Sequence, residues 1–470
     1  MAERSRGRVG ESPVAEASQA VGRSRFVIGL LVLTTMFMST VDSTIVATAL
    51  PAIHRSLHAT INWAGWTITI YSLGVVVSLP TSGRLSNQLG RRRVFMWALA
   101  VFTGGSLLCG LSTNIYELIG FRALQALGGG ALTPTAAGII SEHFGKDRDR
   151  ALGLFSSIAA VGQLTGPVLG GVFVGYLNWH WIFFVNVPIG IVILALVPRF
   201  IGESRTLGPR RIDVNGIALL TLFILLSTLA ITNLGDRKIN DGEFVLVPAI
   251  VGAAILVVFI RHNRRASDPF IPLHLLYGRG FGNINLLNFF WGFAGWGMAT
   301  LVPLYAEDRY RLSALNAGSL LSSRAVTMSI FGFIAAMALR RSGYRLPMIV
   351  GYAVTAAAML MMTFGARGIG DYGWLAIAAG LTGIGNGLAS PASRNAGLEV
   401  VPDEVAAATG LRFMFNSIGT IYCVSIVTSI LNRSIDPGLA QAHVIWIMAA
   451  IIALVMIPLV RGIPEHKGAW

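Results

Sequence analysis

Long apolar runs, separated by short polar segments, are the dominant pattern of this chain. A helix that crosses about 30 Å of hydrocarbon needs about 20 mostly apolar residues. Fourteen runs approach or exceed this length, at 26–50, 61–82, 94–111, 116–138, 151–175, 182–198, 214–233, 244–261, 279–303, 315–337, 346–364, 373–394, 404–429 and 442–462. We predict that each is a transmembrane helix, because an open strand cannot satisfy its backbone hydrogen bonds in lipid.

Composition supports this interpretation. Of 470 residues, 54% are hydrophobic and 12% are charged, and the mean hydropathy is +0.66. Soluble domains contain about 25% charged residues, so this chain has too few polar side chains to cover a soluble globule of its size. Intrinsic disorder is excluded because the chain contains too much apolar side chain. The fold class that remains is an all-α integral membrane protein.

The net charge of +14 is explained mainly by the topology. Lys and Arg number 26 on the side of the termini and seven on the opposite side, while Arg122, Arg324 and Arg412 lie inside spans. Because cytoplasmic loops carry the excess of basic residues, we expect both termini in the cytoplasm. We expect no nucleic-acid partner, since the longest basic run is the three residues 91–93.

An internal repeat divides the chain into two halves. The sequence GGGALTP from Gly128 is echoed by GNGLASP from Gly385, at an offset of 257, and the loop from Gly83 is echoed from Ala336, at an offset of 253. Such echoes indicate two related six-helix halves with two extra helices between them. The predicted segments are a basic cytoplasmic tail (1–25), an N-terminal half (26–198), a linker with two inserted helices (199–265), a C-terminal half (266–462) and a cytoplasmic tail (463–470).

Four motifs and one further segment carry a family resemblance. They are VDSTIVATALP from Val41, GRLSNQLGRRR from Gly83, RALQALGGG from Arg122, GQLTGPVLGG from Gly162, and the segment NWHWIFFVNVPIG from Asn178. Together they resemble the major facilitator superfamily, and within it the fourteen-helix drug:proton antiporters of the multidrug exporter type. The resemblance implies a transporter whose two halves rock around a central cavity.

The glycine motif of the fifth span has a physical explanation of its own. Glycines place backbone where other residues have side chains and so permit close helix approach. A proline removes a helical hydrogen bond and favours a bend. The resemblance implies that this exporter motif lets helices slide past one another; its residues are Gly162, Gly166, Pro167, Gly170 and Gly171.

The loop after the second span resembles the family's conformational latch. Its residues are Gly83, Asn87, Gly90, Arg91 and Arg92. Asn87 replaces the usual Asp, which removes a charge–dipole interaction of about 0.3–1 kcal/mol. The departure implies a weaker latch.

Asp42 and Arg122 are charged residues inside spans, and we place them at similar depths from residue counts at 1.5 Å per residue. An ionisable residue in a span is a functional candidate because its insertion is costly. Our hypothesis is that Asp42 carries the coupling proton and Arg122 tunes its affinity. A static ion pair that only fixes the helices is the alternative.

Arg324 and Arg412 lie near the predicted midplane of the C-terminal half, where we find no acid at similar depth. This excess of positive charge favours anionic substrates that carry a carboxylate or phosphate. The alternative is that each Arg braces a helix junction through backbone carbonyls. We assign further cavity residues of polar or aromatic type: Asn285, Asn288, Trp291, Gln125 and Asn416.

The sequence therefore favours a proton-coupled exporter of small amphipathic compounds in a bacterial-type inner membrane, with a lipid carrier or flippase as the alternative. An enzyme is not expected, because the His residues form no cluster with acids inside the spans. We expect no metal and no cofactor beyond the proton gradient, since Cys109 and Cys423 lie in apolar runs and no ATP-binding phosphate loop occurs. The expected partners are a small-molecule substrate, protons and membrane lipids, and the expected state is a monomer.

Overall fold

The computed structural model describes residues 13–203, 213–236, 242–266, 269–271, 275–276, 281–365, 369–400, 405–463 and 465. Helices make up nearly all of this part of the chain, and it contains no strand. The first helix already begins at Pro13, within the segment that the sequence analysis assigns to the tail.

The N-terminal half consists of seven α-helical segments, because the sixth expected span is divided at Val185. These are α1 (Pro13–Ser56), α2 (Ile61–Leu89), α3 (Arg91–Leu111), α4 (Ile115–His143), α5 (Arg148–Tyr176), α6 (Trp181–Phe184) and α7 (Asn186–Phe200). Two further helices, α8 (Val214–Gly235) and α9 (Glu243–Arg265), follow between the halves.

The C-terminal half begins with a helix that is interrupted by a π-helical turn. Its parts are α11 (Phe281–Phe290), η2 (Trp291–Gly297), α12 (Met298–Thr300) and α13 (Val302–Tyr310). The remaining elements are α14 (Ala314–Ser342), α15 (Arg345–Thr363), α16 (Asp371–Val400), α17 (Val405–Arg433), α18 (Pro437–Ile451), η4 (Ile452–Met456) and α19 (Ile457–Val460).

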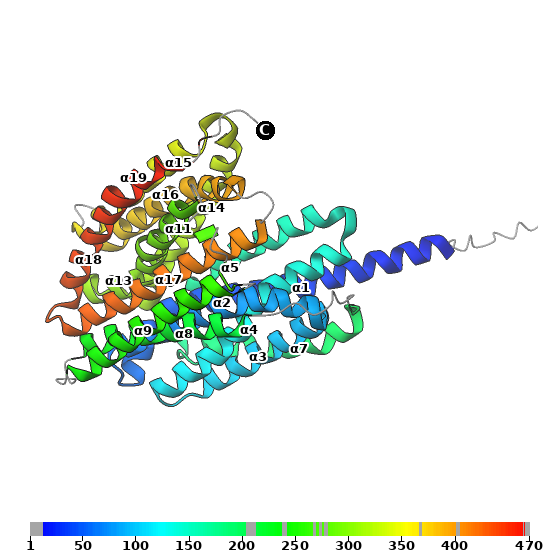
Figure 1. Ribbon diagram of the computed structural model, residues 1–470, viewed down its shortest axis with the longest axis horizontal. Coiled ribbons are helices and arrows are strands. Elements are labelled where there is room, and N and C mark those ends of the chain that lie inside the picture. The colour runs from blue at the N-terminus through cyan, green and yellow to red at the C-terminus, as the bar shows by residue number, and fades with distance from the viewer. Residues whose placement is uncertain are drawn as a thin grey trace, which may run out of the picture.

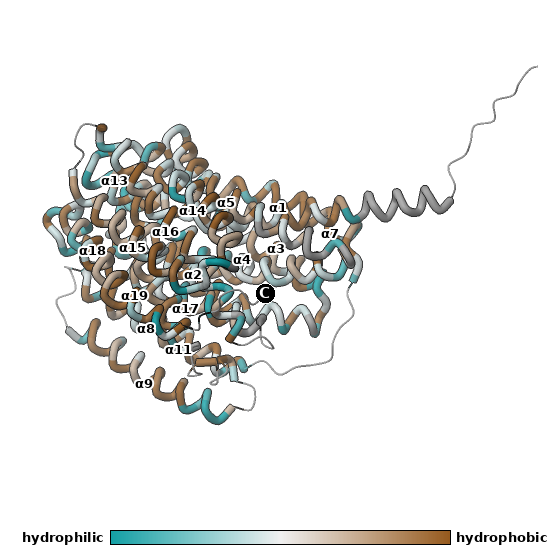
Figure 2. The backbone as a smooth tube through the Cα atoms, turned by 90° about the horizontal axis from the view of Figure 1, so that it is seen from above, coloured by the Kyte–Doolittle hydropathy of each residue, from teal (hydrophilic) through white to brown (hydrophobic). Residues whose placement is uncertain are grey.

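Eleven of the described helices are long and apolar enough to cross a bilayer. The three other expected spans fall on α4, on α16 and on the interrupted helix α11–α13. Glycines and polar residues in the middle of α4 and α16 lower their hydropathy. Figure 2 shows hydrophobic colour along α9 and hydrophilic colour at its ends, the distribution expected of a helix that faces lipid.

The glycine repeat is also visible in the packing. A Cβ at Gly128 would clash with backbone of α3, and one at Gly385 would clash with backbone of α15. Gly130 packs in the same way against α2, and Gly387 against α14. The two echoes therefore make equivalent contacts with the two preceding helices of their own half.

The halves meet along two pairs of helices, α5 with α14 and α2 with α17. Gly171 of α5 would place a Cβ 2.8 Å from Leu315 Cα of α14, and Gly65 of α2 would place one 3.0 Å from Thr428 Cγ2 of α17. These contacts lie toward the ends that carry the α1–α2 and α13–α14 connections. In Figure 1 the halves meet at that end, on the lower left, and separate toward the upper right.

Helix α8 contacts both halves. Trp66 Nε1 of α2 donates to Thr232 Oγ1 at 2.7 Å, and Ser429 Oγ of α17 donates to the carbonyl of Ile231 at 3.0 Å. A Cβ at Gly235 would lie 2.5 Å from Ser429 Cβ. The first inserted helix is therefore packed over the α2–α17 pair.

The glycine motif of α5 packs against α1. Gly162, Gly166 and Gly170 all face α1, where a Cβ would meet Thr40, Thr44 and the carbonyl of Ile45 respectively. Pro167 lies inside the same helix, and its carbonyl contacts Gly318 of α14. Helix α5 is thus in close contact with its own half on one face and with the other half on another.

We expect Gly166→Ala to destabilise the protein by about 1–3 kcal/mol, the usual effect of overpacking. The new Cβ would clash with Thr44 Oγ1 and lie 3.1 Å from the carbonyl of Val41. Gly175→Ala is the matched control on the same helix, because nothing lies within 4 Å of its added Cβ. Thermal unfolding in detergent compares the two; equal melting temperatures would contradict this packing.

Candidate functional site

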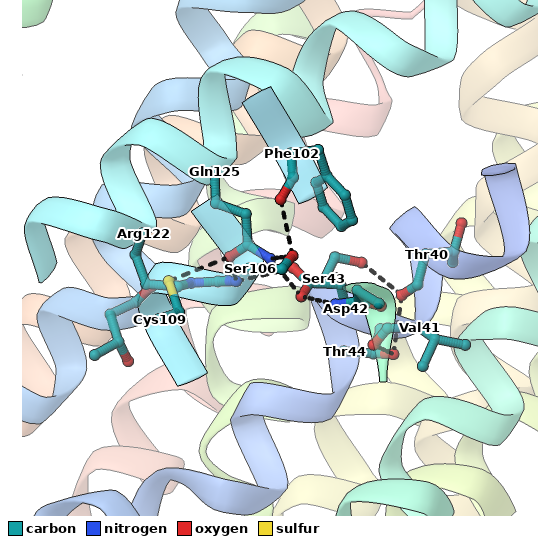
Figure 3. A network of polar contacts seen from close by, with 12 residues as sticks. Thr40, Val41, Asp42, Ser43, Thr44, Phe102, Ser106, Cys109, Arg122 and Gln125 are labelled. Carbon is teal, nitrogen blue, oxygen red and sulfur yellow. Dashed lines mark hydrogen bonds and ion pairs between the residues drawn. The ribbon is translucent and has the colours of Figure 1, made fainter. Parts of the chain in front are cut away.

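Asp42 lies in the middle of the N-terminal half with none of its surface exposed. Its Oδ2 accepts a hydrogen bond from Arg122 Nη1 at 2.8 Å. Its Oδ1 accepts from Gln125 Nε2 at 2.8 Å and from Asn186 Nδ2 at 2.9 Å. Three donors from α4 and α7 therefore surround a carboxylate of α1. Figure 3 shows Asp42 with the two donors from α4, Arg122 and Gln125.

Arg122 is 1% exposed and has partners on several elements. Besides Asp42, Nη1 donates to Gln125 Oε1 at 2.6 Å, and Nε donates to the carbonyl of Thr67 at 3.3 Å. The guanidinium also lies 4.0 Å from the ring centre of Tyr71, within range of a cation–π interaction. The charge of Arg122 is compensated by Asp42 and shared among neutral acceptors.

Gln125 extends the network to α3. Its Nε2 donates to Ser106 Oγ at 2.7 Å, and Ser106 Oγ donates to the carbonyl of Phe102 at 2.9 Å. The structure therefore places Gln125 with Asp42, not among the residues that line the central cavity.

Two apolar clusters of the N-terminal half share the helices that carry this network. One contains Met38 and Phe102, and the other contains Ile45 and Phe183. A buried ion pair is tolerated only when hydrogen bonds satisfy its remaining donors and acceptors. The amides of Gln125 and Asn186 supply such bonds.

Sequence reasoning did not assign Asn186, Ser106 or Tyr71 to the site. Asn186 lies in the segment NWHWIFFVNVPIG, and an amide within such an apolar stretch is the signal that could have identified it. Ser106 and Tyr71 carry no comparable signal, because serine and tyrosine are common in membrane helices.

A cavity of about 360 Å³ lies between the two halves. Its walls come from α1, α2 and α5 on one side and from η2, α12, α14 and α17 on the other. They are formed by Ser43, Thr44, Ala47, Ile68, Ser72, Gln163, Pro167, Trp296, Ala299, Thr300, Leu321, Arg324, Ala325, Met328, Phe413, Asn416 and Thr420. The volume lies in the range of drug-sized ligand sites, which are mostly apolar with a few polar groups.

Arg324 is the charged residue among the described walls of this cavity. It is 8% exposed, and its Nη2 donates to Asn386 Oδ1 at 3.3 Å. The guanidinium also lies 4.8 Å from the ring centre of Trp296, another wall residue. Within the described part of the chain no carboxylate forms an ion pair with Arg324, in contrast to Arg122.

Of the six other predicted cavity residues, the structure places Asn416 in the cavity wall and five elsewhere, Gln125 among them. Arg412 donates to Asn288 Oδ1 at 3.5 Å and to Ser393 Oγ at 3.4 Å, and so connects α17 with α11 and α16. Asn285 Nδ2 donates to the carbonyl of Leu275 at 3.0 Å. Trp291 is buried with its ring centre 5.1 Å from that of Tyr352.

Arg91 and Arg92, at the start of α3, form ion pairs with α4 and with the segment that follows α7. Arg91 pairs with Glu142 at 3.6 Å, and Arg92 pairs with Glu203 at 3.1 Å. Gly90 has a φ of +95°, which favours glycine. The other latch glycine, Gly83, has open space around it. The side chain of Asn87 lies outside the described residues.

Comparison with known proteins gives consistent results. The family model of the Major Facilitator Superfamily matches residues 32–322 and 284–469. The multidrug transporter protein MdtP of Bacillus subtilis (strain 168) is 30% identical, over 87% of this chain and 75% of that protein. MdtD of Klebsiella pneumoniae (strain 342), named for multidrug resistance, is 31% identical over 92% of this chain and 93% of its own. A POT family transporter in complex with 5-aminolevulinic acid has the same fold, with a TM-score of 0.69 at 14% identity, covering 92% of this chain and 95% of the other.

Two repeated halves around a central cavity, built from apolar helices, define a membrane transporter. The chain belongs to the Major Facilitator Superfamily. It is therefore a transporter and not an enzyme, and its bacterial relatives place it as a multi-pass protein of the inner membrane.

A double-mutant cycle tests how strongly Asp42 and Arg122 depend on each other. We expect Asp42→Asn and Arg122→Gln each to lower the free energy of unfolding by about 3–5 kcal/mol, because each leaves a buried charge without its partner. The double variant is expected to lose less than the sum, by about 2 kcal/mol. Unfolding in detergent mixtures measures this, with Glu117→Gln as an exposed control. Additive losses would show that the two charges are not coupled.

Proposed function

We propose that the protein exports small amphipathic compounds from the cytoplasm in exchange for protons, with a preference for substrates that carry a carboxylate or phosphate. The observation that carries this proposal is the contrast between two buried arginines. Arg122 is paired with the carboxylate of Asp42. Arg324 lies in the cavity wall and donates to a neutral acceptor, the side-chain oxygen of Asn386. The names of the relatives MdtP and MdtD support multidrug export.

The proton site proposed at Asp42 is next to the cavity because the residues that follow Asp42 in the sequence line the cavity. Ser43 and Thr44, the next two residues of α1, are wall residues. Gly166 of α5 packs directly on Thr44. A movement of α5 relative to α1 would therefore change the cavity wall and the position of Asp42 together, and substrate binding and proton binding would depend on each other.

The substrate preference follows from the donors of Arg324. A guanidinium has five N–H donors in a planar fork, and one of them is directed at Asn386. A carboxylate or phosphate in the cavity would accept two parallel hydrogen bonds from such a fork. Trp296 and Phe413 in the same wall would contact an apolar body.

Orientation forms part of the proposal. The basic side of the chain is assigned to the cytoplasm, and fourteen spans with both termini cytoplasmic remain our topology. The α1–α2 and α13–α14 connections then face outward. The described inter-half contacts lie toward that side, which corresponds to an inward-facing conformation.

Proton coupling is tested with Asp42→Asn in proteoliposomes that contain an acidic lumen. We expect proton-driven substrate uptake to fall at least tenfold, because the amide cannot take up and release the proton. Glu117→Gln, which removes an exposed carboxylate at the end of α4, should transport like the unmodified protein. Full proton-driven uptake by Asp42→Asn would refute the assignment.

Substrate charge is tested with a panel of anionic, neutral and cationic compounds of similar size. We expect Arg324→Gln to reduce transport of the anionic members about 10–100-fold, since a charge-assisted hydrogen bond contributes about 1.5–3 kcal/mol. Arg324→Lys should retain more of this activity. Arg412→Gln is the control, because Arg412 is a partly buried arginine of the same half that does not line the cavity.

Equal transport of cations and anions that does not change in Arg324→Gln would refute the charge preference while leaving export itself intact. Movement of phospholipid alone, with no member of the panel transported, would favour the lipid-carrier alternative.

A further inference from the structure

An ion pair joins the two halves at the proposed outer end of the molecule. Arg55 Nη2, at the end of α1, lies 3.0 Å from Glu307 Oε2 of α13. The two side chains differ in exposure: Arg55 is 61% exposed and Glu307 is 8% exposed. The pair is therefore a buried carboxylate covered by a surface cation from the opposite half.

Glu307 is only partly satisfied in this position. Its Oε1 is buried and, among the described atoms, accepts no hydrogen bond. Burying a carboxylate with one oxygen unpaired disfavours the charged form. A protonated carboxyl would not carry this penalty and could still accept the hydrogen bond from Arg55.

We propose that Glu307 is a second proton-binding group of this transporter, which receives its proton from the outer side and, once protonated, favours closure of that side beneath Arg55. The inference uses the orientation in "Proposed function", but it does not depend on Asp42 or on the identity of the substrate. Glu307 moves no proton across the membrane in this scheme. It makes the return to the inward-facing state sensitive to external pH.

The charges around Glu307 set the sign of this effect. Burial raises the pKa of Glu307, against the hydrogen bond and the positive charge of Arg55, and the neighbouring Asp308 raises it further. Asp308 is itself surrounded by the positive charges of Arg55 and Arg311 and by His54.

When the outer side opens, Glu307 is solvated and its pKa returns toward the usual value of about 4.3. A group with the higher pKa in the closed state binds its proton more tightly there. Protonation therefore stabilises closure. Closure is strongest below the usual glutamate pKa and weakens as the pH rises through the raised pKa of the closed state.

The experiment measures the outer separation of the halves as a function of pH. Spin labels are placed at the exposed positions Tyr176 on α5 and Ile435 before α18, with the buried Cys109 and Cys423 replaced by alanine. Pulsed electron paramagnetic resonance then reports the distance between the labels in nanodiscs. We expect the short-distance population to grow as the pH falls from 8 to 5.

Two variants distinguish the effect of protonating Glu307 from the effect of the neighbouring charge of Arg55. Glu307→Gln imitates the protonated carboxyl, so the short distance should dominate at every pH. Arg55→Gln removes the cation that lowers the pKa, so the midpoint of the transition should move to higher pH. A wild-type pH response in Glu307→Gln, or an unmoved midpoint in Arg55→Gln, would overturn the proposal.

A neighbouring acid is tested as the matched control. Asp308→Asn should retain a pH-dependent distance, since the transition is assigned to Glu307. Loss of the response in Asp308→Asn would assign the transition to that residue instead. The readout needs no transport, so failure of this proposal is distinct from failure of the exporter function.

Discussion

The buried pair of Asp42 and Arg122 imposes the strictest constraint on this structure. Two full charges inside a helical bundle are stable only if nearly every donor and acceptor around them is satisfied. Here that requirement fixes four helices at once. Gln125 and Asn186 donate hydrogen bonds to the Asp42 carboxylate, and Ser106 accepts a further hydrogen bond from Gln125. A rotation of α1, α3, α4 or α7 that broke one of these bonds would leave a buried polar group unpaired, so the N-terminal half has a single well-defined packing.

The C-terminal half repeats the geometry without repeating the charge compensation. Tyr71 of α2 and Arg324 of α14 are separated by the repeat offset of 253 residues. At the first position, the ring of Tyr71 packs on the guanidinium of Arg122. At the equivalent position of the C-terminal half, Arg324 supplies the guanidinium, which packs on the ring of Trp296. One half therefore contains a neutral, internally satisfied network, and the other presents a net positive charge to the shared cavity. The proposed assignment of proton binding to one half and of substrate binding to the other follows from this difference in side chains on equivalent backbones.

Much of this arrangement could be predicted from the sequence, and the limits have physical causes. Residue counts place Asp42 and Arg122 at matching depth, and the structure pairs them. Depth, however, says nothing about which helices are neighbours or how each is rotated. Gln125 therefore joins the charged pair and not the cavity, and Arg412 braces a helix junction one turn from the wall residue Asn416.

Contacts between distant segments were missed for the same reason. Asn186 carries an amide in an apolar stretch but no sign of its partner 144 residues earlier. Arg55 and Glu307 lie 252 residues apart, outside the predicted spans, where loop charges are normally solvated. The π-helical turn from Trp291 to Gly297 divides a run that reads as one continuous helix, and its glycines allow α17 to approach closely.

The glycine face of α5 has a consequence for how this protein can evolve. Positions such as Gly166 and Gly170 have no room for a side chain. Selection should therefore remove substitutions there, regardless of which compound is exported. Wall positions such as Leu321, Met328 and Phe413 are apolar and line open volume. New substrate specificities should therefore arise through changes on α14 and α17, while the α1–α5 contact is inherited almost unchanged among descendants with different substrates.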